Sequence, residues 1–467
     1  MRGPSRVFSK LFLAAGLSFF VWGAGSTVLA QVGKAGNPDP DWNGGSGVIT
    51  SNPTYKYMSA WGGALQPDGK LVVVGSANNS LSPVWPYGVF ALARFTRTGQ
   101  LDPTFGQGGF VHTSFGDAVD TAGALVIHPD GKITALGCVT VRGPAFALAQ
   151  YQPDGSLNPD FGQGGQVITD VSCGNAEFID IGIQADGKIV FAGTMVNQRG
   201  QPIEIRYAVV RVNPDGSLDR SFGNEGVVID VFRDNSRGVT MAIQTDGKIV
   251  VGGVNLSRDF KTSSAALARY LPDGRTDPTF GQEGKVTTED AGIRTSLGKL
   301  QLQPDGKILF VGYNRSNNSQ EIPGGVARFE TDGRLDATFG SGGFARVAIP
   351  GRQTFIPTDV TTQHDGKILV SGLSLRQGMI GMVPKVIWDT LVVARLNPDG
   401  SADLSFGTQG VVTRTNNDHS DYIATDVVVD GEGRITVTGW YREYRVVHGP
   451  LTVANSVHVL TERFLGR

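Results

Sequence analysis

Residues 91–109 read ALARFTRTGQLDPTFGQGG, and nearly the same phrase returns at 147–165 and at 266–284. Two landmarks recur with it: a turn that begins Asp-Gly-Lys, and an aromatic residue followed by glycine. Successive aromatic landmarks stand 56–67 residues apart, at Phe105, Phe161, Phe222, Phe280, Phe339 and Phe406. A regular period of this length indicates a repeat architecture.

Each copy reads as four short strands. In the copy at 121–170, the apolar runs ALVIH (124–128), KITALG (132–137), AFALAQY (145–151) and QVITD (166–170) are separated by turns rich in Asp and Gly. No helical pattern interrupts them, which is typical of an antiparallel propeller blade. A β-solenoid is the alternative, although its repeats are usually shorter.

We therefore expect an all-β, seven-bladed β-propeller whose last blade is completed by an N-terminal strand within 44–50, so that no open edge remains. The expected blades are 59–113, 121–170, 177–231, 238–288, 297–349, 357–415, and 424–467 together with 37–50.

Residues 1–30 resemble an export signal. A basic start precedes the apolar run 11–25, and small residues before Gln31 suit cleavage there. We expect a mature chain of 31–467 that is periplasmic or extracellular. A membrane anchor is the alternative, but the run is short for a bilayer span. The net charge of −2 gives no reason to expect nucleic acid as a partner. We expect a monomer without a membrane span.

An arginine near the end of each third strand is followed eight positions later by an aspartate. The second copy replaces both, with Gln150 and Asn158, which suggests that the two positions touch. We expect a structural pair in each blade; a ring of arginines that binds anions is the alternative. The pairs are Arg94 with Asp102, Arg211 with Asp219, Arg269 with Asp277, Arg328 with Asp336, Arg395 with Asp403, and Arg463 with Asp39.

The stretches LQPDGKILFVG (302–312), FALARF (90–95) and LDPTFGQGGFV (101–111) resemble the bacterial delta-60 repeat, also described as a domain-of-unknown-function β-propeller repeat. The resemblance covers about 37–467. It implies a propeller in an exported or surface protein and implies no established activity. The degraded turn at 430–434 and Trp42 in place of Phe depart from the pattern.

The two cysteines, Cys138 and Cys173, fall at the same end of the second copy. In an oxidising compartment we expect them to form a disulfide. Two buried free thiols are the alternative.

Loops that vary between copies share one face, where repeat scaffolds usually bind their ligands. Aromatic residues gather in the last two copies and the first, and we expect a rim that binds a sugar or a peptide. Packing over the seam where the ends of the chain meet is the alternative. The candidate binding residues are Trp61, Trp85, Tyr87, Trp388, Trp440, Tyr441 and Tyr444.

Asp359 and Asp426 stand six positions before the turns of their copies, as do Asp180 and Lys299; the turn after Asp426 is the degraded copy at Glu432. The first two could hold a hard cation, and calcium is the candidate; solvated side chains at a channel mouth are the alternative. We predict no other cofactor.

No catalytic motif is recognisable, so we assign no catalytic residue. We expect a scaffold for binding an extracellular or cell-envelope protein or glycan. The alternatives are a hydrolase or lyase acting on polysaccharide or peptidoglycan, and a purely structural module.

Overall fold

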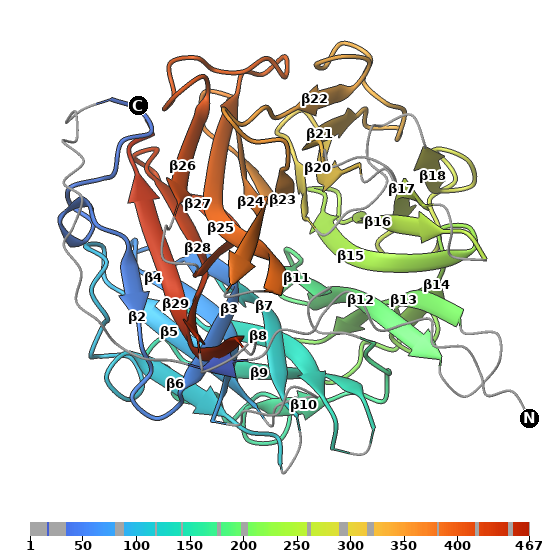
Figure 1. Cartoon of the computed structure of the whole chain (residues 1–467). Helices are drawn as coiled ribbons and strands as arrows, with labels where there is room; N and C mark the ends of the chain where they lie inside the picture. The colour runs from blue at the N-terminus through green and yellow to red at the C-terminus, as the bar shows by residue number, and fades with distance from the viewer. Residues whose placement is uncertain are drawn as a thin grey trace, which may run out of the picture.

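The structure is a computed structural model, shown in Figure 1, and every strand runs through a segment rich in β-branched and apolar residues. The residues that it describes are 16–17, 34–79, 88–116, 119–141, 143–174, 179–197, 204–258, 263–288, 298–314, 322–380, 383–415, 420–446 and 452–466.

The Asp-Gly turns set the register of each first hairpin. In the second copy Gly131 adopts a φ of 85°, a left-handed conformation that side chains disfavour. The backbone N–H of Lys132 donates to Asp130 Oδ1 at 3.1 Å, which fixes the turn. The following strand is thereby reversed onto the preceding one.

Five separate sheets have four antiparallel strands each. Their strands are β7 (Thr121–Ile127), β8 (Ile133–Val139), β9 (Ala145–Tyr151) and β10 (Gln166–Ile168); β11 (Ile179–Ile183), β12 (Ile189–Asn197), β13 (Glu204–Val212) and β14 (Val227–Asp230); β15 (Asn235–Ile243), β16 (Ile249–Leu256), β17 (Ser263–Tyr270) and β18 (Lys285–Thr288); β19 (Leu300–Leu302), β20 (Ile308–Tyr313), β21 (Gly324–Phe329) and β22 (Phe344–Arg346); and β23 (Ile356–Thr362), β24 (Ile368–Ile380), β25 (Val383–Leu396) and β26 (Val411–Thr415).

The remaining strands form one nine-stranded sheet, and a short 3₁₀ helix, η1 (Asn43–Gly45), precedes β2. The strands are β1 (Gly16–Leu17), β2 (Val48–Thr50), β3 (Tyr57–Leu65), β4 (Leu71–Asn78), β5 (Val89–Phe95), β6 (Phe110–Thr113), β27 (Asp421–Val429), β28 (Ile435–Val446) and β29 (Thr452–Phe464).

The expectation of seven four-stranded blades is wrong: the propeller has five such blades. The strands assigned to the first and last blades belong to the nine-stranded sheet, because Val457 of β29 pairs in parallel with Tyr57 of β3. On the same edge of β29, β2 pairs antiparallel, with Val48 opposite Thr461. The repeat pattern does not encode the parallel pairing of β29 with β3, since it joins two copies rather than forming within one.

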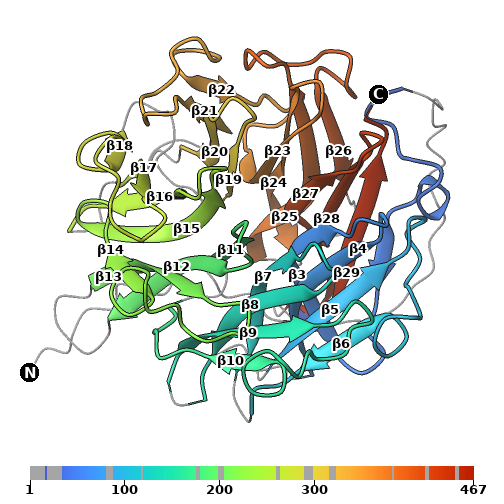
Figure 2. The ribbon, with the colours of Figure 1, turned by 180° about the vertical axis from the view of Figure 1, so that it is seen from behind.

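The first strands of the sheets surround the centre of the molecule. β3, β7, β11, β15, β19, β23 and β27 each contact the next, and β27 contacts β3 again, as the two opposite views show (Figures 1 and 2). Buried apolar clusters fill the space between neighbouring sheets. In one of them, Phe146 of β9 packs edge-on against Phe191 of β12 at 5.6 Å between ring centroids.

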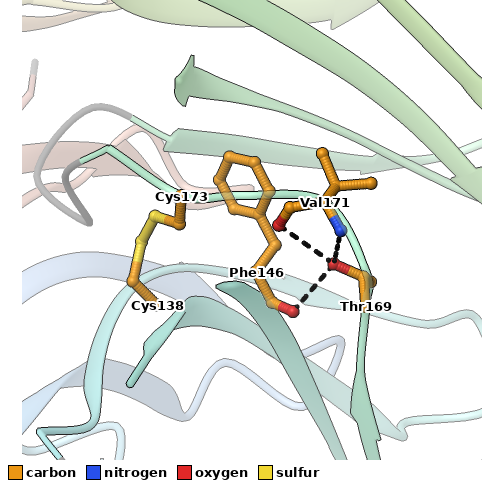
Figure 3. Close-up of a disulfide and its surroundings, with 5 residues drawn as sticks. All are labelled: Cys138, Phe146, Thr169, Val171 and Cys173. Atoms are coloured by element: carbon orange, nitrogen blue, oxygen red, sulfur yellow. Dashed lines mark hydrogen bonds between the residues drawn. A yellow bond between two sulfur atoms is a disulfide. The ribbon is translucent and has the colours of Figure 1, made fainter. Parts of the chain in front are cut away.

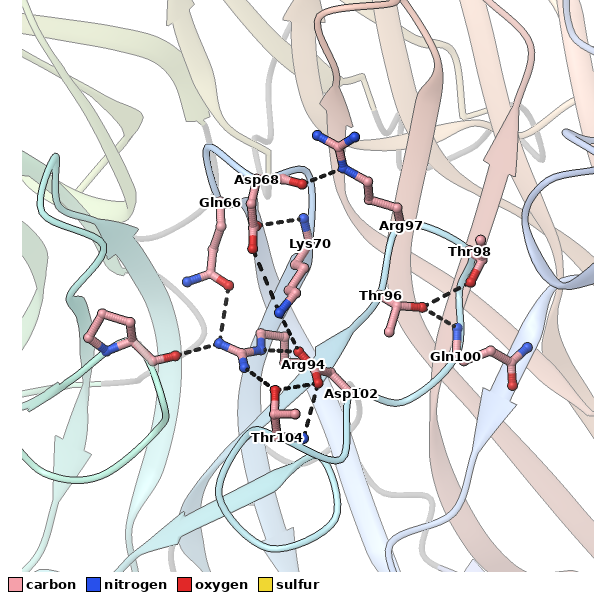
Figure 4. Close-up of polar contacts among 11 residues, drawn as sticks. Gln66, Asp68, Lys70, Arg94, Thr96, Arg97, Thr98, Gln100, Asp102 and Thr104 are labelled. Carbon is pink, nitrogen blue, oxygen red and sulfur yellow. Dashed lines mark hydrogen bonds and ion pairs between the residues drawn. The ribbon is translucent and has the colours of Figure 1, made fainter.

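A polar clasp lies at the turn end of β5 (Figure 4). Arg94 Nε donates to Asp102 Oδ2 at 2.8 Å, and Lys70 Nζ lies 2.9 Å from the same oxygen. Arg94 Nη2 donates to Thr104 Oγ1 at 3.1 Å. The guanidinium also lies 4.5 Å from the centroid of the Phe105 ring. The repeated arginine, aspartate and phenylalanine therefore form one packed unit.

The same guanidinium reaches the neighbouring sheet, because Arg94 Nη1 donates to the carbonyl of Pro153. The arginines of the four-stranded sheets and Arg94 thus each join two sheets, whereas Arg463 joins two parts of the nine-stranded sheet. The equivalent acceptors are the carbonyls of Pro272 for Arg211, Thr331 for Arg269, Pro398 for Arg328, Gly466 for Arg395 and Arg97 for Arg463.

We predict that Arg463→Ala lowers the free energy of unfolding by about 3–5 kcal/mol, because it leaves the buried Asp39 carboxylate, 2.6 Å from Arg463 Nε, without its partner. Urea unfolding measures the loss. The double variant Arg463→Gln, Asp39→Asn should lose less, since it leaves no buried charge.

The control is Arg220→Ala, which removes the exposed pair with Glu225 and should change the free energy of unfolding by less than about 1 kcal/mol. Equal losses for Arg463→Ala and Arg220→Ala would contradict this account of the clasp.

Candidate functional site

The structure describes part of the expected aromatic rim. Trp85 and Tyr87 lie outside the described residues. Trp388 lies in β25 and Tyr444 in β28, but the description of these two covers the backbone and not the side chain. The remaining candidates are Trp61 of β3 and Trp440 and Tyr441 of β28.

Trp61 and Trp440 come together. Their ring centroids are 6.2 Å apart in an edge-to-face arrangement. Trp440 is 4 % exposed and packs with Leu373 and Ile423, whereas Trp61 is partly exposed at the margin of the same apolar cluster. The pair therefore joins β3 to β28, the two antiparallel parts of the nine-stranded sheet.

A cation and an unpartnered donor border this pair. The Arg442 guanidinium carbon lies 4.5 Å from the centroid of the Trp440 ring, and Arg442 Nη1 lies 3.7 Å from Asp421 Oδ2. The Trp440 Nε1–H group is buried and has no hydrogen-bond partner among the described residues. A buried donor left without an acceptor costs about 1–3 kcal/mol, so this group is one that a bound acceptor could satisfy. We call Trp61, Trp440 and Arg442 the seam site.

Tyr441 does not join the seam site. Successive side chains of a strand point to opposite faces, so Tyr441 turns away from Trp440. It is 6 % exposed, packs in the apolar cluster that contains Phe464, and has its hydroxyl 3.0 Å from Ser420 Oγ. We predicted that Trp440 and Tyr441 share one rim because the two residues are adjacent in the chain.

The central carboxylates are buried, and they accept hydrogen bonds that link neighbouring first strands. Asp359 Oδ2 accepts from the N–H of Val427 at 2.8 Å, and Asp426 Oδ2 accepts from the N–H of Gly63 at 2.7 Å. Both residues are buried. The alternative of solvated side chains at a channel mouth is therefore wrong for these two residues, which lie within the ring of first strands.

The same arrangement continues on the other side of the ring. Asp180 Oδ2 accepts from the Met241 N–H at 3.0 Å and from the Thr240 hydroxyl at 2.9 Å. Thr240 Oγ1 in turn accepts from the N–H of Leu300 at 3.1 Å. Sequence reasoning missed Thr240, although its position six residues before Asp246 carried the signal. We call Asp180, Thr240, Lys299, Asp359 and Asp426 the central belt.

Charge in the central belt is balanced internally. Lys299 Nζ lies 3.1 Å from Asp426 Oδ2. Burial would lower the pKa of Lys299, but the charges of Asp426, Asp359 and Asp180 outweigh it and raise that pKa. Burial and the neighbouring charge of Asp426 raise the pKa of Asp359 well above its usual range. Burial opposes ionisation of Asp426 as well, but Lys299 outweighs it and holds the pKa of Asp426 below its usual range, so that Asp359 is the member of the pair that keeps a proton more readily.

This geometry bears on the expected calcium site at Asp359 and Asp426. The Lys299 ammonium occupies a position beside Asp426 and supplies the positive charge that a cation would have brought. The described residues contain no group of three or more His, Cys, Asp or Glu side chains arranged to hold a metal ion.

Cys138 of β8 and Cys173, in the segment that follows β10, are joined by a disulfide with 5.9 Å between their Cα atoms (Figure 3). Beside it, Thr169 Oγ1 donates to the Phe146 carbonyl at 3.0 Å and accepts from the N–H of Val171 at 3.3 Å. These contacts hold the chain that leaves β10 against β9.

Six segments match a family model described as "Domain of unknown function (DUF5122) beta-propeller". The match supports a β-propeller repeat family of unknown function. A search of curated proteins found no match. The matching segments are 66–105, 128–161, 184–222, 244–280, 303–339 and 389–406.

Several solved structures are similar to this chain at low identity. The polysaccharide lyase Uly1 is 10 % identical, with a TM-score of 0.44 over 89 % of this chain and 91 % of that one. A PL25 ulvan lyase bound to -[GlcA(1-4)Rha3S]- is 11 % identical, with a TM-score of 0.45 over 84 % and 93 %. A protein of unknown function from Dyadobacter fermentans DSM 18053 is 12 % identical, with a TM-score of 0.42 over 90 % of this chain and 98 % of that one.

No membrane-spanning helix is found in the part of the chain that the structure describes.

We predict that Asp359→Asn flattens the dependence of stability on pH. Asp359 holds its proton in the folded protein and releases it in the unfolded chain above the usual carboxyl pKa. The wild-type free energy of unfolding should therefore fall as pH rises from that value toward the raised pKa, by up to about 1.4 kcal/mol per pH unit. The asparagine cannot ionise and should remove this contribution. Urea unfolding between about pH 5 and about pH 8 measures both slopes.

The control is Asp305→Asn, which changes an exposed turn aspartate and should leave the wild-type slope unchanged. Parallel curves for wild type and Asp359→Asn would show that Asp359 takes up no proton on folding.

Proposed function

We propose that this protein is an exported binding scaffold whose ligand contacts the seam site. The observation that carries the proposal is the buried Trp440 Nε1–H group. It has no acceptor in the part of the protein that the structure describes, and it lies in an apolar cluster whose outer member, Trp61, is partly exposed. Ligand sites combine apolar and aromatic walls with a few polar groups that fix orientation. Trp61 would supply the wall, and Trp440 Nε1 and Arg442 the polar groups.

The chemistry of the site favours a saccharide chain as the ligand. A sugar ring offers an apolar face, which an indole can stack against, and a rim of hydroxyls that accept hydrogen bonds. The indole donor and the Arg442 guanidinium lie beside one another to meet such acceptors. A peptide is the alternative ligand that the experiment below distinguishes.

Binding is favoured over catalysis because the gathered carboxylates are already engaged. Asp180, Asp359 and Asp426 each accept backbone N–H groups from a neighbouring strand. A hydrolase or lyase needs a carboxyl group that is free to exchange a proton with a bound substrate. The seam site contains no carboxylate among its defining residues.

Two finer assignments support this function and remain part of the proposal. The apolar segment within residues 1–30 suits export, and an exported protein would meet glycans outside the cytoplasm. Membership of the delta-60 repeat family, proposed on the repeated motifs, agrees with a surface role.

Intrinsic tryptophan fluorescence of residues 31–467 tests the proposal by titration with neutral oligosaccharides, acidic oligosaccharides and a peptide mixture. We expect a saturable change with a saccharide, and a loss of affinity of about tenfold or more in Trp61→Ala, since truncating a central aromatic contact typically costs more than 1 kcal/mol.

The matched control is Ile229→Ala, which removes an exposed apolar side chain from the outer strand β14 and should bind as wild type does. Saturation by the peptides alone would reassign the ligand class. A wild-type affinity in Trp61→Ala would reject the seam site, and product formation that one carboxylate substitution abolishes would identify an enzyme.

A further inference from the structure

The junction between the sheet β7–β10 and the sheet β11–β14 lacks the arginine clasp. Gln150 takes the place of the arginine, and its Nε2 donates to Thr134 Oγ1 at 3.1 Å within its own sheet. Asn158 Nδ2 donates to Gln150 Oε1 at 2.6 Å, so the pair is satisfied without charge. Within the described ranges the shorter amide makes no hydrogen bond to β11–β14, whereas Arg94 and Arg211 both reach the next sheet.

The residue opposite Gln150 on β8 also differs from the residue opposite Arg94 on β4. Thr134 pairs with Gln150 at the position where Val72 pairs with Arg94. The Thr134 hydroxyl is the acceptor of the Gln150 amide, and Thr436 holds the same position opposite Arg463. This junction is therefore built with a polar contact confined to one sheet.

The Cys138–Cys173 disulfide serves the same junction from the opposite end of the strands. Cys173 is 3 % exposed and belongs to the apolar cluster that contains Phe146 and Phe191, which come from the two sheets. Directly after it, the N–H of Gly174 donates to the Thr194 carbonyl of β12 at 2.7 Å. The disulfide thus fixes, on β8, the segment of chain that docks onto the next sheet.

We propose that this disulfide replaces the arginine clasp at the β7–β10/β11–β14 junction and makes that junction a redox-controlled opening point of the ring. A dithiol reductant supplies two electrons and two protons, the S–S bond breaks, Cys138 and Cys173 become thiols, and the dithiol becomes a cyclic disulfide. The junction then retains its apolar contacts and the hydrogen bond from the Gly162 N–H to the Asp215 carbonyl, and it loses the bond that holds Cys173 on β8. The other junctions keep their guanidinium bonds and stay closed.

The first experiment is hydrogen exchange of the wild-type protein with and without dithiothreitol. We expect reduction to accelerate exchange at least tenfold in β9–β12, with rates in β16–β21 unchanged. Uniform acceleration around the ring, or no acceleration in β9–β12, would overturn the proposal.

The second experiment is a double-mutant cycle that restores the clasp. One change is Cys138→Ala with Cys173→Ala, and the other is Gln150→Arg with Asn158→Asp, which writes the usual pair into this sheet. If the two devices substitute for one another, the new pair should slow exchange in β9–β12 much more without the disulfide than with it.

The matched control for the cycle uses a junction that already has its arginine. Arg328→Gln with Asp336→Asn copies the uncharged pair into β19–β22. Its effect should be the same with and without the disulfide. Additive effects at both junctions would show that the disulfide and the clasp are independent and would overturn the proposal.

Discussion

The hydrogen bond from the guanidinium of one sheet to a main-chain carbonyl of the next is the interaction on which the ring depends. Arg94 shows the arrangement: Nε binds the buried carboxylate of Asp102, and Nη1 crosses to Pro153. The aspartate keeps the arginine in position, and the ring of Phe105 lies beneath it. Burial would raise the pKa of such a carboxyl, but hydrogen bonds and the nearby cations outweigh it, so that the pKa of Asp277 is about 2. The clasp is therefore charged throughout the physiological range.

The central belt fastens the same sheets nearer the centre, by a different chemistry. Its aspartate and threonine side chains accept hydrogen bonds from backbone N–H groups of neighbouring first strands. Each contact is therefore directional and occupies the accepting oxygen. Lys299 offsets the charge of Asp426, and burial raises the pKa of both Asp180 and Asp359, which favours their uncharged forms. Buried carboxylates in the middle of a propeller would ordinarily suggest a catalytic or metal site. Here the carboxylates accept hydrogen bonds from backbone N–H groups instead.

Local pattern predicted much of this architecture. The strands, the turns and the eight-residue spacing from Arg94 to Asp102 recur along the chain. Because one copy replaces both members of the pair, with Gln150 and Asn158, the sequence alone indicates that the two positions are in contact. Features that belong to no single copy were not predictable. The parallel pairing of Val457 with Tyr57 joins two copies and replaces the expected separate blades with one sheet. Trp440 and Tyr441 are adjacent in the chain, but their side chains lie on opposite faces of the sheet because successive side chains of a strand alternate between the two faces.

The pairing of Arg463 with Asp39 spans 424 positions of the chain. The ribosome adds Asp39 long before it adds Arg463. Until Arg463 has been synthesised, Asp39 lacks the guanidinium that binds it in the folded protein, and β29 cannot pair with β2 and β3. Contacts so remote in sequence form slowly, since a long loop must close before they form. A chain that stops before β29 would therefore leave the Asp39 carboxylate without its partner at an open seam.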